Sequence, residues 1–427
     1  MLQVIHERCA GLDVHKKTVV ACALVTKQDG QVQQEKLTFG TTTGEILAMA
    51  EWLKGQEISS VAMESTGVYW IPIYNLLEGS FELLVVNAQH MKAVPGRKTD
   101  VSDAEWIGQL HRHGLLKGSF VPPKPQRQLR ELVRHRTNVV ERRSQSVNEL
   151  QKVLETANIK LASVVSEITG VSAMEMVYGL IQGQQEPQVL AELARGRLRD
   201  KKPQLAAALS GRLEEHHRFI LSQLLADISF CEEQILELDL QIQIQMKDYE
   251  EVIKRLDEIP GVNRRIAEVL VAEMGTDTSR FGDAAHVVSW AGMCPGNNQS
   301  GSKRRSARVR QGNKSLKRVL VEAAHAAGRK KDSYFSAQYH RLAARRGKKR
   351  AKVAVGRSIL ETAFHMIQRK TAYKDLGSDY FDRRNPEKLA QRLAERIVRL
   401  GYKVSFEPTG KAAAGYKLSY QPLEKVA

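Results

Sequence analysis

Near its start the chain reads Ala10-Gly11-Leu12-Asp13-Val14-His15-Lys16, and Thr18 to Val25 follows at once. The second run is rich in apolar and β-branched residues, which is typical of a β-strand. Asp13 is therefore expected to project from the start of a sheet. Its carboxylate is the first of four acidic side chains on which the functional prediction depends.

A second acid, Glu64, closes the short apolar run Ser60-Val61-Ala62-Met63-Glu64. Such a run is typical of a buried strand, and Ser65-Thr66-Gly67 marks a turn into a helix. Open α/β sheets place their sites at the carboxyl ends of strands. Glu64 is therefore a second candidate site residue.

Two further acids lie in Lys98-Thr99-Asp100-Val101-Ser102-Asp103-Ala104. Their i, i+3 spacing puts Asp100 and Asp103 on one face of a predicted helix, which Thr99 or Asp100 is expected to cap. Taken alone, each acid is more typical of a solvated turn or cap than of a metal site.

Taken together, carboxylates that converge on one point repel one another unless cations lie between them. Mg²⁺ is the hard cation that suits such a set best. Two ions about 3.5 to 4 Å apart stabilise both the attacking and the leaving oxygen of a phosphodiester displacement. The four acids therefore predict a metal-dependent enzyme that cuts nucleic acid.

The charge of the chain also predicts a polyanionic partner, because 65 Lys and Arg against 48 Asp and Glu give a formal net charge of +17. The excess is concentrated between Lys303 and Arg350, where Glu322 and Asp332 are the only acids. A membrane partner is disfavoured, since the sequence has no long apolar span, signal peptide or lipidation motif. A cytoplasmic, nucleoid-associated protein is expected.

The cysteines and histidines predict no metal site of their own. Cys9, Cys22, Cys231 and Cys294 form no CxxC pair, and their surroundings are typical of core or helix positions rather than of a disulfide framework. The histidines are scattered. His111 and His113 diverge on a helix, and His216-His217 are merely adjacent.

The chain divides into four predicted parts. Residues 1–117 alternate strand-like and helix-like runs, which predicts an α/β domain around a mixed sheet. A proline-rich linker follows, and residues 126–256 are predicted to be helical. Residues 257–370 form a third, mostly helical unit, and residues 371–427 a carboxyl-terminal extension with a basic helix from Pro386 to Leu400 and a strand from Tyr402 to Phe406.

The helical part contains a coiled-coil seam of apolar residues at alternating spacings of three and four: Leu221, Leu224, Ile228, Cys231, Ile235, Leu238 and Ile242. A second apolar set predicts a partner helix: Val133, Val140, Val147 and Leu154. An antiparallel hairpin within one chain and a contact between two chains both agree with this pattern. The coiled coil is expected to carry its two ends apart, and the stretch from about Lys160 to Gly211 to be helical and polar.

The third unit begins at Ile259-Pro260-Gly261-Val262-Asn263, which resembles a helix-hairpin-helix turn. The backbone N–H groups of such a turn face a phosphate, so Gly261 is a candidate nucleic-acid contact. A glycine-rich loop from Trp290 then runs through Ser300 into the basic region. The candidate phosphate contacts there are Lys303, Arg304, Arg305, Arg308, Arg310 and Lys314.

Five short motifs in this order resemble the DEDD-type insertion-sequence transposases of the IS110 family, including its IS1111 branch. They are Gly11-Leu12-Asp13-Val14-His15-Lys16, Met63-Glu64-Ser65-Thr66-Gly67, Lys98 to Ala104, Ile259-Pro260-Gly261-Val262, and Ala291-Gly292 through Gln299-Ser300-Gly301. The resemblance implies a RuvC-like domain of the RNase H superfold, a helical coiled-coil segment and a carboxyl-terminal transposase domain. The middle segment and the tail past about Thr371 are longer than the compact pattern of the family.

The resemblance also implies a mechanism. Asp13, Glu64, Asp100 and Asp103 would bind Mg²⁺, and Ser300 would form a covalent phosphoserine with double-stranded DNA at element ends and target. Ser302 is the rival nucleophile. A structured non-coding guide RNA that pairs with both DNAs, and a homotetramer whose protomers share sites, are implied as partners.

Two other functions agree with the residues alone. One is a RuvC-like junction nuclease that uses metal-activated water, with Ser300 in a structural role. The other is a nucleic-acid-binding scaffold without enzymatic activity.

Overall fold

The computed structural model describes residues 3–27, 29–65, 67–87, 102–184, 186–296, 299–300, 303–304, 309 and 311–405. The chain forms two compact units, Met1–Pro123 and Lys124–Ala427. Each unit has hydrophobic core clusters of its own. Among the described residues, no helix is both long and apolar enough to cross a membrane.

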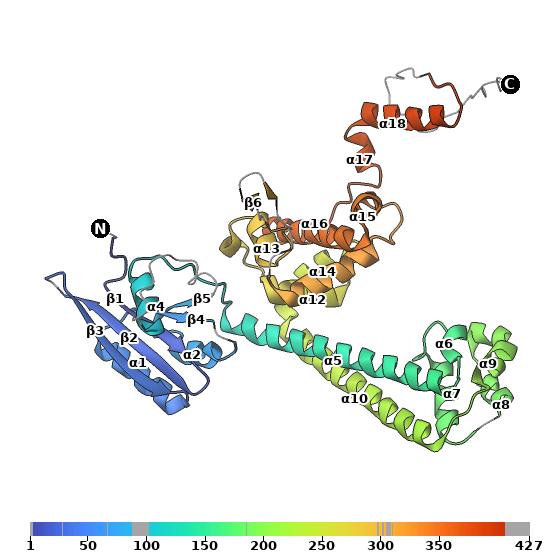
Figure 1. The fold of residues 1–427 in the computed structure, drawn as a ribbon, viewed down its shortest axis with the longest axis horizontal. Coiled ribbons are helices and arrows are strands. Elements are labelled where there is room, and N and C mark those ends of the chain that lie inside the picture. The colour runs from blue at the N-terminus through green and yellow to red at the C-terminus, as the bar shows by residue number, and fades with distance from the viewer. Residues whose placement is uncertain are drawn as a thin grey trace. The chain divides into compact units, whose positions relative to one another are not determined.

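The first unit is built on a five-stranded sheet in the order β3-β2-β1-β4-β5 (Figure 1). Its strands are β1 (Arg8–Val14), β2 (Thr18–Thr26), β3 (Val32–Gly40), β4 (Ser60–Glu64) and β5 (Glu82–Val86). β2 is antiparallel to both β1 and β3, whereas β4 lies parallel to both β1 and β5. The predicted α/β domain with a mixed sheet is confirmed.

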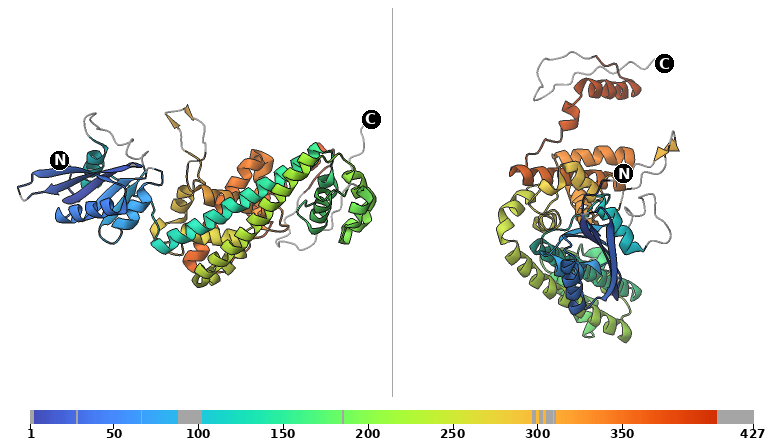
Figure 2. Two further views of the ribbon diagram at one scale, coloured as in Figure 1. Left: turned by 90° about the horizontal axis from the view of Figure 1, so that it is seen from below. Right: turned by 90° about the vertical axis from the view of Figure 1, so that its left-hand side faces the viewer.

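Helices cover both faces of this sheet (Figure 2). α1 (Thr43–Gly55) and α2 (Trp70–Leu77) pack on one face, where Leu12 and Met63 are buried. α4 (Asp103–Arg112) packs on the other face, where Cys9 and Cys22 are buried. Burial raises the pKa of the Cys9 thiol to about 12 and that of Cys22 to about 11. Both thiols are therefore protonated core side chains at neutral pH, as predicted.

α4 runs antiparallel to β1 and β4. Near its last turn, His111 Nε2 lies 2.7 Å from the hydroxyl of Ser60, which begins β4. The amide of Ile5, just before β1, donates to the carbonyl of Arg112 at 2.9 Å. The amino-terminal end of α4 therefore lies toward the carboxyl ends of these two strands.

The crossing of α4 over β1 depends on Gly11. A Cβ atom at this position would lie 2.2 Å from the carbonyl oxygen of Ala104 and 2.3 Å from the backbone nitrogen of Gly108. Real side chains do not approach backbone atoms so closely. Only glycine lets the helix lie against the strand at this point.

A Gly11→Ala substitution is expected to destabilise the protein by about 1 to 3 kcal/mol, because the added methyl group must push α4 off the sheet. Urea unfolding monitored by circular dichroism measures this change. The matched control is Gly44→Ala in α1, where a Cβ meets nothing within 4 Å; that variant should be neutral or slightly stabilising. Equal midpoints for both variants would contradict the proposed close packing.

The second unit begins with a long antiparallel hairpin of α5 (Lys124–Thr156) and α10 (Glu215–Gln245), which lie side by side in Figures 1 and 2. Hydrogen bonds between the two helices join Arg143 to Glu232 and Arg136 to Asp239. Residue numbers increase along α10 in the direction in which they decrease along α5, so the two helices are antiparallel. The seam residues Cys231 and Ile235 pack against Val139. Of the two predicted arrangements of the seam, the structure contains the hairpin within one chain.

This arrangement corrects one expectation. The coiled coil does not carry its two ends apart, because an antiparallel hairpin returns the chain to its starting end. Near the beginning of α5, Arg130 donates to the carbonyl oxygen of Ala272, beyond α10, at 3.1 Å. The beginning of α5 therefore lies beside α12, which follows the hairpin in the sequence.

A small helical unit lies at the far end of the hairpin. It contains α6 (Leu161–Val164), α7 (Val171–Ile181), α8 (Pro187–Glu192), the 3-10 helix η1 (Gly196–Lys201) and α9 (Lys202–Leu209). The predicted helices are confirmed, but the predicted polar character is wrong. Short helices hide the apolar periodicity, and Leu161, Met176 and Leu205 are fully buried in a core shared with the hairpin.

The remaining helices form the base of the second unit. They are α11 (Glu250–Asp257), α12 (Arg264–Met274), α13 (Ala284–Trp290), α14 (Lys314–Ala327), α15 (Tyr334–Arg346) and α16 (Lys348–Arg369), with the two-residue strands β6 (Gln299–Ser300) and β7 (Lys303–Arg304) between α13 and α14. The short 3-10 helices η2 (Lys247–Tyr249) and η3 (Ser279–Phe281) precede α11 and α13.

α17 (Tyr380–Arg383) and α18 (Pro386–Arg399) follow the base, and α18 confirms the predicted basic helix. The strand predicted from Tyr402 is wrong as far as Ser405. A β-strand forms only where it pairs continuously with a neighbouring strand. In this part of the described chain, Tyr402 forms an isolated bridge and the residues after it form no strand. Phe406 lies outside the described residues.

Candidate metal centre and serine loop

The sheet brings Asp13 and Glu64 together. Leu12 pairs with Met63 across the parallel strands β1 and β4, so Asp13 and Glu64 lie next to each other one step further on. Neighbouring strands are about 4.8 Å apart. Leu12 and Met63 point into the core under α1 and α2. Since successive side chains alternate, both carboxylates project from the α4 face.

Asp103 lies at the same edge of this face. It is the first residue of α4, whose amino-terminal end lies toward the carboxyl ends of β1 and β4. Ser102, rather than the predicted Thr99 or Asp100, has the extended backbone of the N-cap residue of α4, and Thr99 lies outside the described residues. Asp100 lies outside the described residues. Three of the four predicted acids thus surround one end of the sheet.

The donor set at this edge fits a hard divalent cation. Carboxylate oxygens are the ligands that such cations prefer, and the amino-terminal end of α4 places positive potential beside the acids. His15 Nε2 also lies 3.1 Å from Asp13 Oδ2. The sequence analysis gave His15 no role. The sequence did indicate that His15 lies near the acid, because it follows Asp13 by two residues. In the structure the turn between β1 and β2 is closed by the hydrogen bond from the amide of His15 to the carbonyl of Thr18.

The second candidate element is the serine loop, defined here as the segment between Gly292 and Gly312. Ser300 lies in β6 and pairs with Lys303 of β7. Closer to the base of the loop, Pro295 forms a bridge with Val309. Ser302, Arg305, Arg308 and Arg310 lie outside the described residues, so Lys303 and Arg304 are the described basic residues next to Ser300.

The two ends of the serine loop are held together by backbone contacts. A Cβ atom at Gly312 would lie 2.3 Å from the backbone nitrogen of Gly292, so this approach requires glycine. The amide of Asn313 donates to the carbonyl of Trp290 at 3.3 Å. The loop therefore stands on a closed base, from which β6 projects (Figure 1).

The closed base is anchored by Glu273 of α12, which is fully buried. Asn313 Nδ2 donates to Glu273 Oε2 at 2.6 Å, while Asn313 Oδ1 accepts from the amide of Leu316 and caps α14. Arg134 of α5 makes two bonds to the same carboxylate, at 2.6 and 2.8 Å. Arg130 Nε lies 3.4 Å from it. One carboxylate thus ties the hairpin, α12 and α14 to the end of the serine loop.

The charges of this cluster balance one another. Burial lowers the pKa of Arg130 to about 10, although Glu273 acts in the opposite direction. The hydrogen bonds that Arg134 donates to Glu273 raise the pKa of the Arg134 guanidinium. Both guanidinium groups are therefore cationic at neutral pH and compensate the buried carboxylate. The sequence analysis missed this cluster, although an acid inside the apolar run of α12 was its visible sign.

Gly261 lies in the predicted turn between α11 and α12. Its φ of +85° suits glycine, and a Cβ there would lie 2.2 Å from the carbonyl oxygen of Ala323 in α14. Close packing against α14 therefore accounts for this glycine without a nucleic acid, and its role as a phosphate contact stays a prediction. Lys314 is exposed at the start of α14.

A histidine cluster lies outside both candidate elements. The ligand atoms of Glu214, His216 and His217 lie within 4.8 Å of one another. The sequence analysis set His216 and His217 aside as merely adjacent and did not consider Glu214. Helix capping accounts for it: the Glu214 side chain accepts from the backbone of His217, and His217 Nδ1 accepts from the amide of Glu214.

Two family models match this chain. One, described as a transposase and of the DEDD type, matches residues 10–159. The other, described as the transposase IS116/IS110/IS902 family, matches residues 253–340. The first contains Asp13, Glu64 and Asp103, and the second contains Glu273 and Ser300. No curated protein shows significant similarity to the chain.

The fold and these matches together define a DNA transposase, with a DEDD-type domain of the kind that generally uses divalent metal ions. The chain belongs to the IS110 family of transposases. Its substrate is therefore DNA. Residues 160–252, which include the small helical unit, lie in neither match.

A Glu273→Gln substitution is expected to destabilise the protein by about 3 kcal/mol, because it leaves Arg130 and Arg134 without the buried charge that compensates them. Chemical unfolding monitored by circular dichroism gives the value. The matched control is Glu237→Gln, which neutralises an exposed acid on α10 and should change stability by less than about 0.5 kcal/mol. A loss no larger than that of the control would show that the buried pair contributes little.

Proposed function

We propose that this transposase cleaves and exchanges DNA strands with Asp13, Glu64, Asp100 and Asp103 as ligands of Mg²⁺ and with Ser300 as the nucleophile. The observation that carries the proposal is the meeting of β1, β4 and the start of α4 at one edge of the sheet, which groups three of the four acids. Bound there, divalent cations would polarise a phosphodiester and stabilise the charge that develops on its oxygens.

Ser300 performs the covalent step in this proposal. Its Oγ attacks the phosphorus of one DNA strand, its proton passes to a base, and the bond from phosphorus to the leaving strand oxygen breaks. The leaving oxygen takes up a proton. A hydroxyl of the incoming strand then attacks the phosphoserine and releases Ser300, so the phosphodiester bond is exchanged without net hydrolysis.

Basic residues next to Ser300 would hold the phosphate during this exchange. Lys303 pairs with Ser300 in the β6–β7 ladder, and Arg304 follows it. Together with Arg305, Arg308, Arg310 and Lys314, they offer cationic donors for a phosphate and for the charge of the transition state. Glu273 anchors the base of the serine loop, which carries β6 and β7. A fixed base suits a loop that must present one hydroxyl group.

We further propose that a structured non-coding RNA from the element guides the reaction. The family resemblance suggests it, and the net charge of +17 suits a protein that binds more than one nucleic acid. Base pairing would then carry the sequence specificity. Recombination of defined sites by rigorously RNA-free protein would overturn this part of the proposal.

The proposed assembly is a homotetramer whose protomers share catalytic sites. The α5–α10 hairpin returns the chain to the end at which it started. The length of the coiled coil therefore does not support the sharing of catalytic sites between protomers. Support comes from the family resemblance and from an exposed apolar stripe on α10, where Phe230, Leu240 and Ile244 are 56%, 57% and 60% exposed. A second copy of the chain would cover such a stripe. Mixed assemblies of Ser300→Ala and Asp13→Asn proteins should regain recombination if sites are shared.

Replacing Asp13, Glu64, Asp100 or Asp103 singly by its amide should reduce strand exchange at least 100-fold, because each loss misplaces a cation that the transition state requires. DNA binding should persist, since the basic residues are untouched. A recombination assay and a mobility-shift assay measure the two effects. Glu51→Gln, at an exposed ion pair of α1, serves as the control. Normal exchange by one amide variant would remove that acid from the site.

Wild-type protein trapped during the reaction should carry a covalent DNA adduct on Ser300, detected by denaturing gel and peptide mass spectrometry. Ser300→Ala should abolish the adduct and the exchange, whereas Ser302→Ala should retain both. Metal-dependent cleavage without any adduct would instead identify a nuclease that uses activated water. Absence of cleavage under all metal conditions would favour a binding scaffold.

A further inference from the structure

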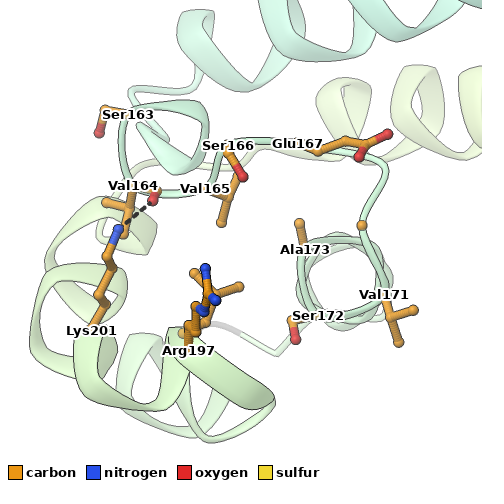
Figure 3. A pocket seen from close by; sticks show the side chains of 12 residues that line it. Ser163, Val164, Val165, Ser166, Glu167, Val171, Ser172, Ala173, Arg197 and Lys201 are labelled. Carbon is orange, nitrogen blue, oxygen red and sulfur yellow. Dashed lines mark hydrogen bonds between the residues drawn. The ribbon is translucent and has the colours of Figure 1, made fainter. Parts of the chain in front are cut away.

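The small helical unit at the far end of the hairpin contains a cavity of about 560 Å³ (Figure 3). It lies between the loop that joins α6 to α7, the start of α7, and η1. This volume is in the range of sites for small molecules. Neither family match includes these residues.

Two basic side chains line the cavity, and both come from η1. They belong to the run Arg195-Gly196-Arg197-Leu198-Arg199-Asp200-Lys201-Lys202. The first and last residues of this run are neutralised by ion pairs, Arg195 with Glu175 and Lys202 with Glu192. Arg197 and Lys201, which line the cavity, have no acidic partner among the described residues.

The orientation of the side chains keeps positive charge in the cavity. Figure 3 shows the Arg197 guanidinium pointing into the open space, while the Glu167 carboxylate points away from it. Thr169 Oγ1 donates to Glu167 Oε1 at 3.0 Å. Lys201 Nζ donates to the carbonyl of Val164 at 3.4 Å, which leaves further donors of the ammonium group available.

The start of α7 adds unpaired backbone donors on another side of the cavity. Its N-cap residue, Gly170, provides no side-chain bond. The amides of Val171, Ser172 and Ala173 have no hydrogen-bond partner within the described part of the chain. Ser172 is 6% exposed and Ala173 is 1% exposed, so bulk water has little access to these two residues. Unpaired N–H groups at the positive end of a helix favour an anion.

The remaining walls are apolar or carry hydroxyl groups. Val164, Val165 and Leu198 line the cavity, and Ser166 points its hydroxyl toward it in Figure 3. The cavity therefore combines a guanidinium, an ammonium and helix amides with an apolar surface. This chemistry matches a phosphate group attached to an organic moiety, rather than a bare cation or a purely apolar ligand.

We propose that this cavity binds a nucleotide through its phosphate, with Arg197, Lys201 and the start of α7 as the phosphate contacts. The substrate of a DNA transposase is built of nucleotides, which are organic phosphates. The ligand would be either a free nucleotide or an unpaired nucleotide of a strand. The sugar and base lie against the apolar wall. The cavity is a binding site separate from the acids and the serine loop, and its occupancy does not depend on the recombination mechanism.

The test is a titration of the full-length protein with three probes: AMP, inorganic phosphate and a single-stranded trinucleotide. Arg197→Glu should weaken binding of AMP or of the trinucleotide at least tenfold. Arg199→Glu makes the same change of charge in η1 at a position outside the cavity lining, and it should change the dissociation constant by less than twofold. Circular dichroism verifies that both variants are folded.

A third variant separates shape from charge. Ser166→Trp leaves the charge unchanged but fills the cavity from its exposed rim, and it should also weaken binding at least tenfold. Saturable AMP binding that inorganic phosphate displaces supports a free nucleotide as ligand, whereas binding of the trinucleotide alone supports an unpaired residue of a strand. Equal weakening by Arg197→Glu and Arg199→Glu, or no saturable binding of any probe, would overturn the proposal.

Discussion

The buried carboxylate of Glu273 is the interaction on which the second unit depends. A buried anion is tolerated only when it is compensated, and Arg130, Arg134 and Asn313 supply the donors. These partners come from α5 and from the residue that caps α14, so the charge cannot be satisfied unless the hairpin, α12 and α14 are all in place. The end of the serine loop is fixed by the same condition, because Asn313 both binds Glu273 and follows Gly312.

The acidic edge of the first unit is built in a different way, from the backbone geometry of its strands and of α4. The parallel register of β1 and β4 sets Asp13 beside Glu64, and the close crossing at Gly11 sets the height of α4 above them. This difference suits the two proposed tasks: acids proposed to hold cations must approach one another, whereas a loop proposed to present one hydroxyl needs a rigid anchor.

The sequence predicted the parts of this fold that depend on local periodicity, and it missed those that depend on contacts over long distances in the chain. Glu64 was placed correctly at a strand end because the five-residue apolar run of β4 carries its own signature. Asp13 was expected just before the strand that begins at Thr18, and it lies near the carboxyl end of the preceding strand, β1. The cap of α4 was misplaced at Thr99 or Asp100, because Asp and Thr are as good at this position as Ser102. Glu273 was missed because its partners lie about 40 and 140 residues away. The hairpin and the contact between chains could not be separated, since both bury the same heptad face.

The helical unit at the end of the hairpin shows how this chain could gain a long middle segment without disturbing either candidate site. Its core is shared only with the ends of α5 and α10, and the base of the hairpin, where Arg130 and Arg134 hold Glu273, lies at the other end of these helices. A helix rises about 1.5 Å per residue, so each arm of the hairpin, with some thirty residues, separates its two ends by about 45 Å. A unit so far from the serine loop is free to acquire chemistry of its own. The unpaired cations around its cavity are more consistent with such a separate role than with a spacer, because a spacer has no need to concentrate uncompensated charge.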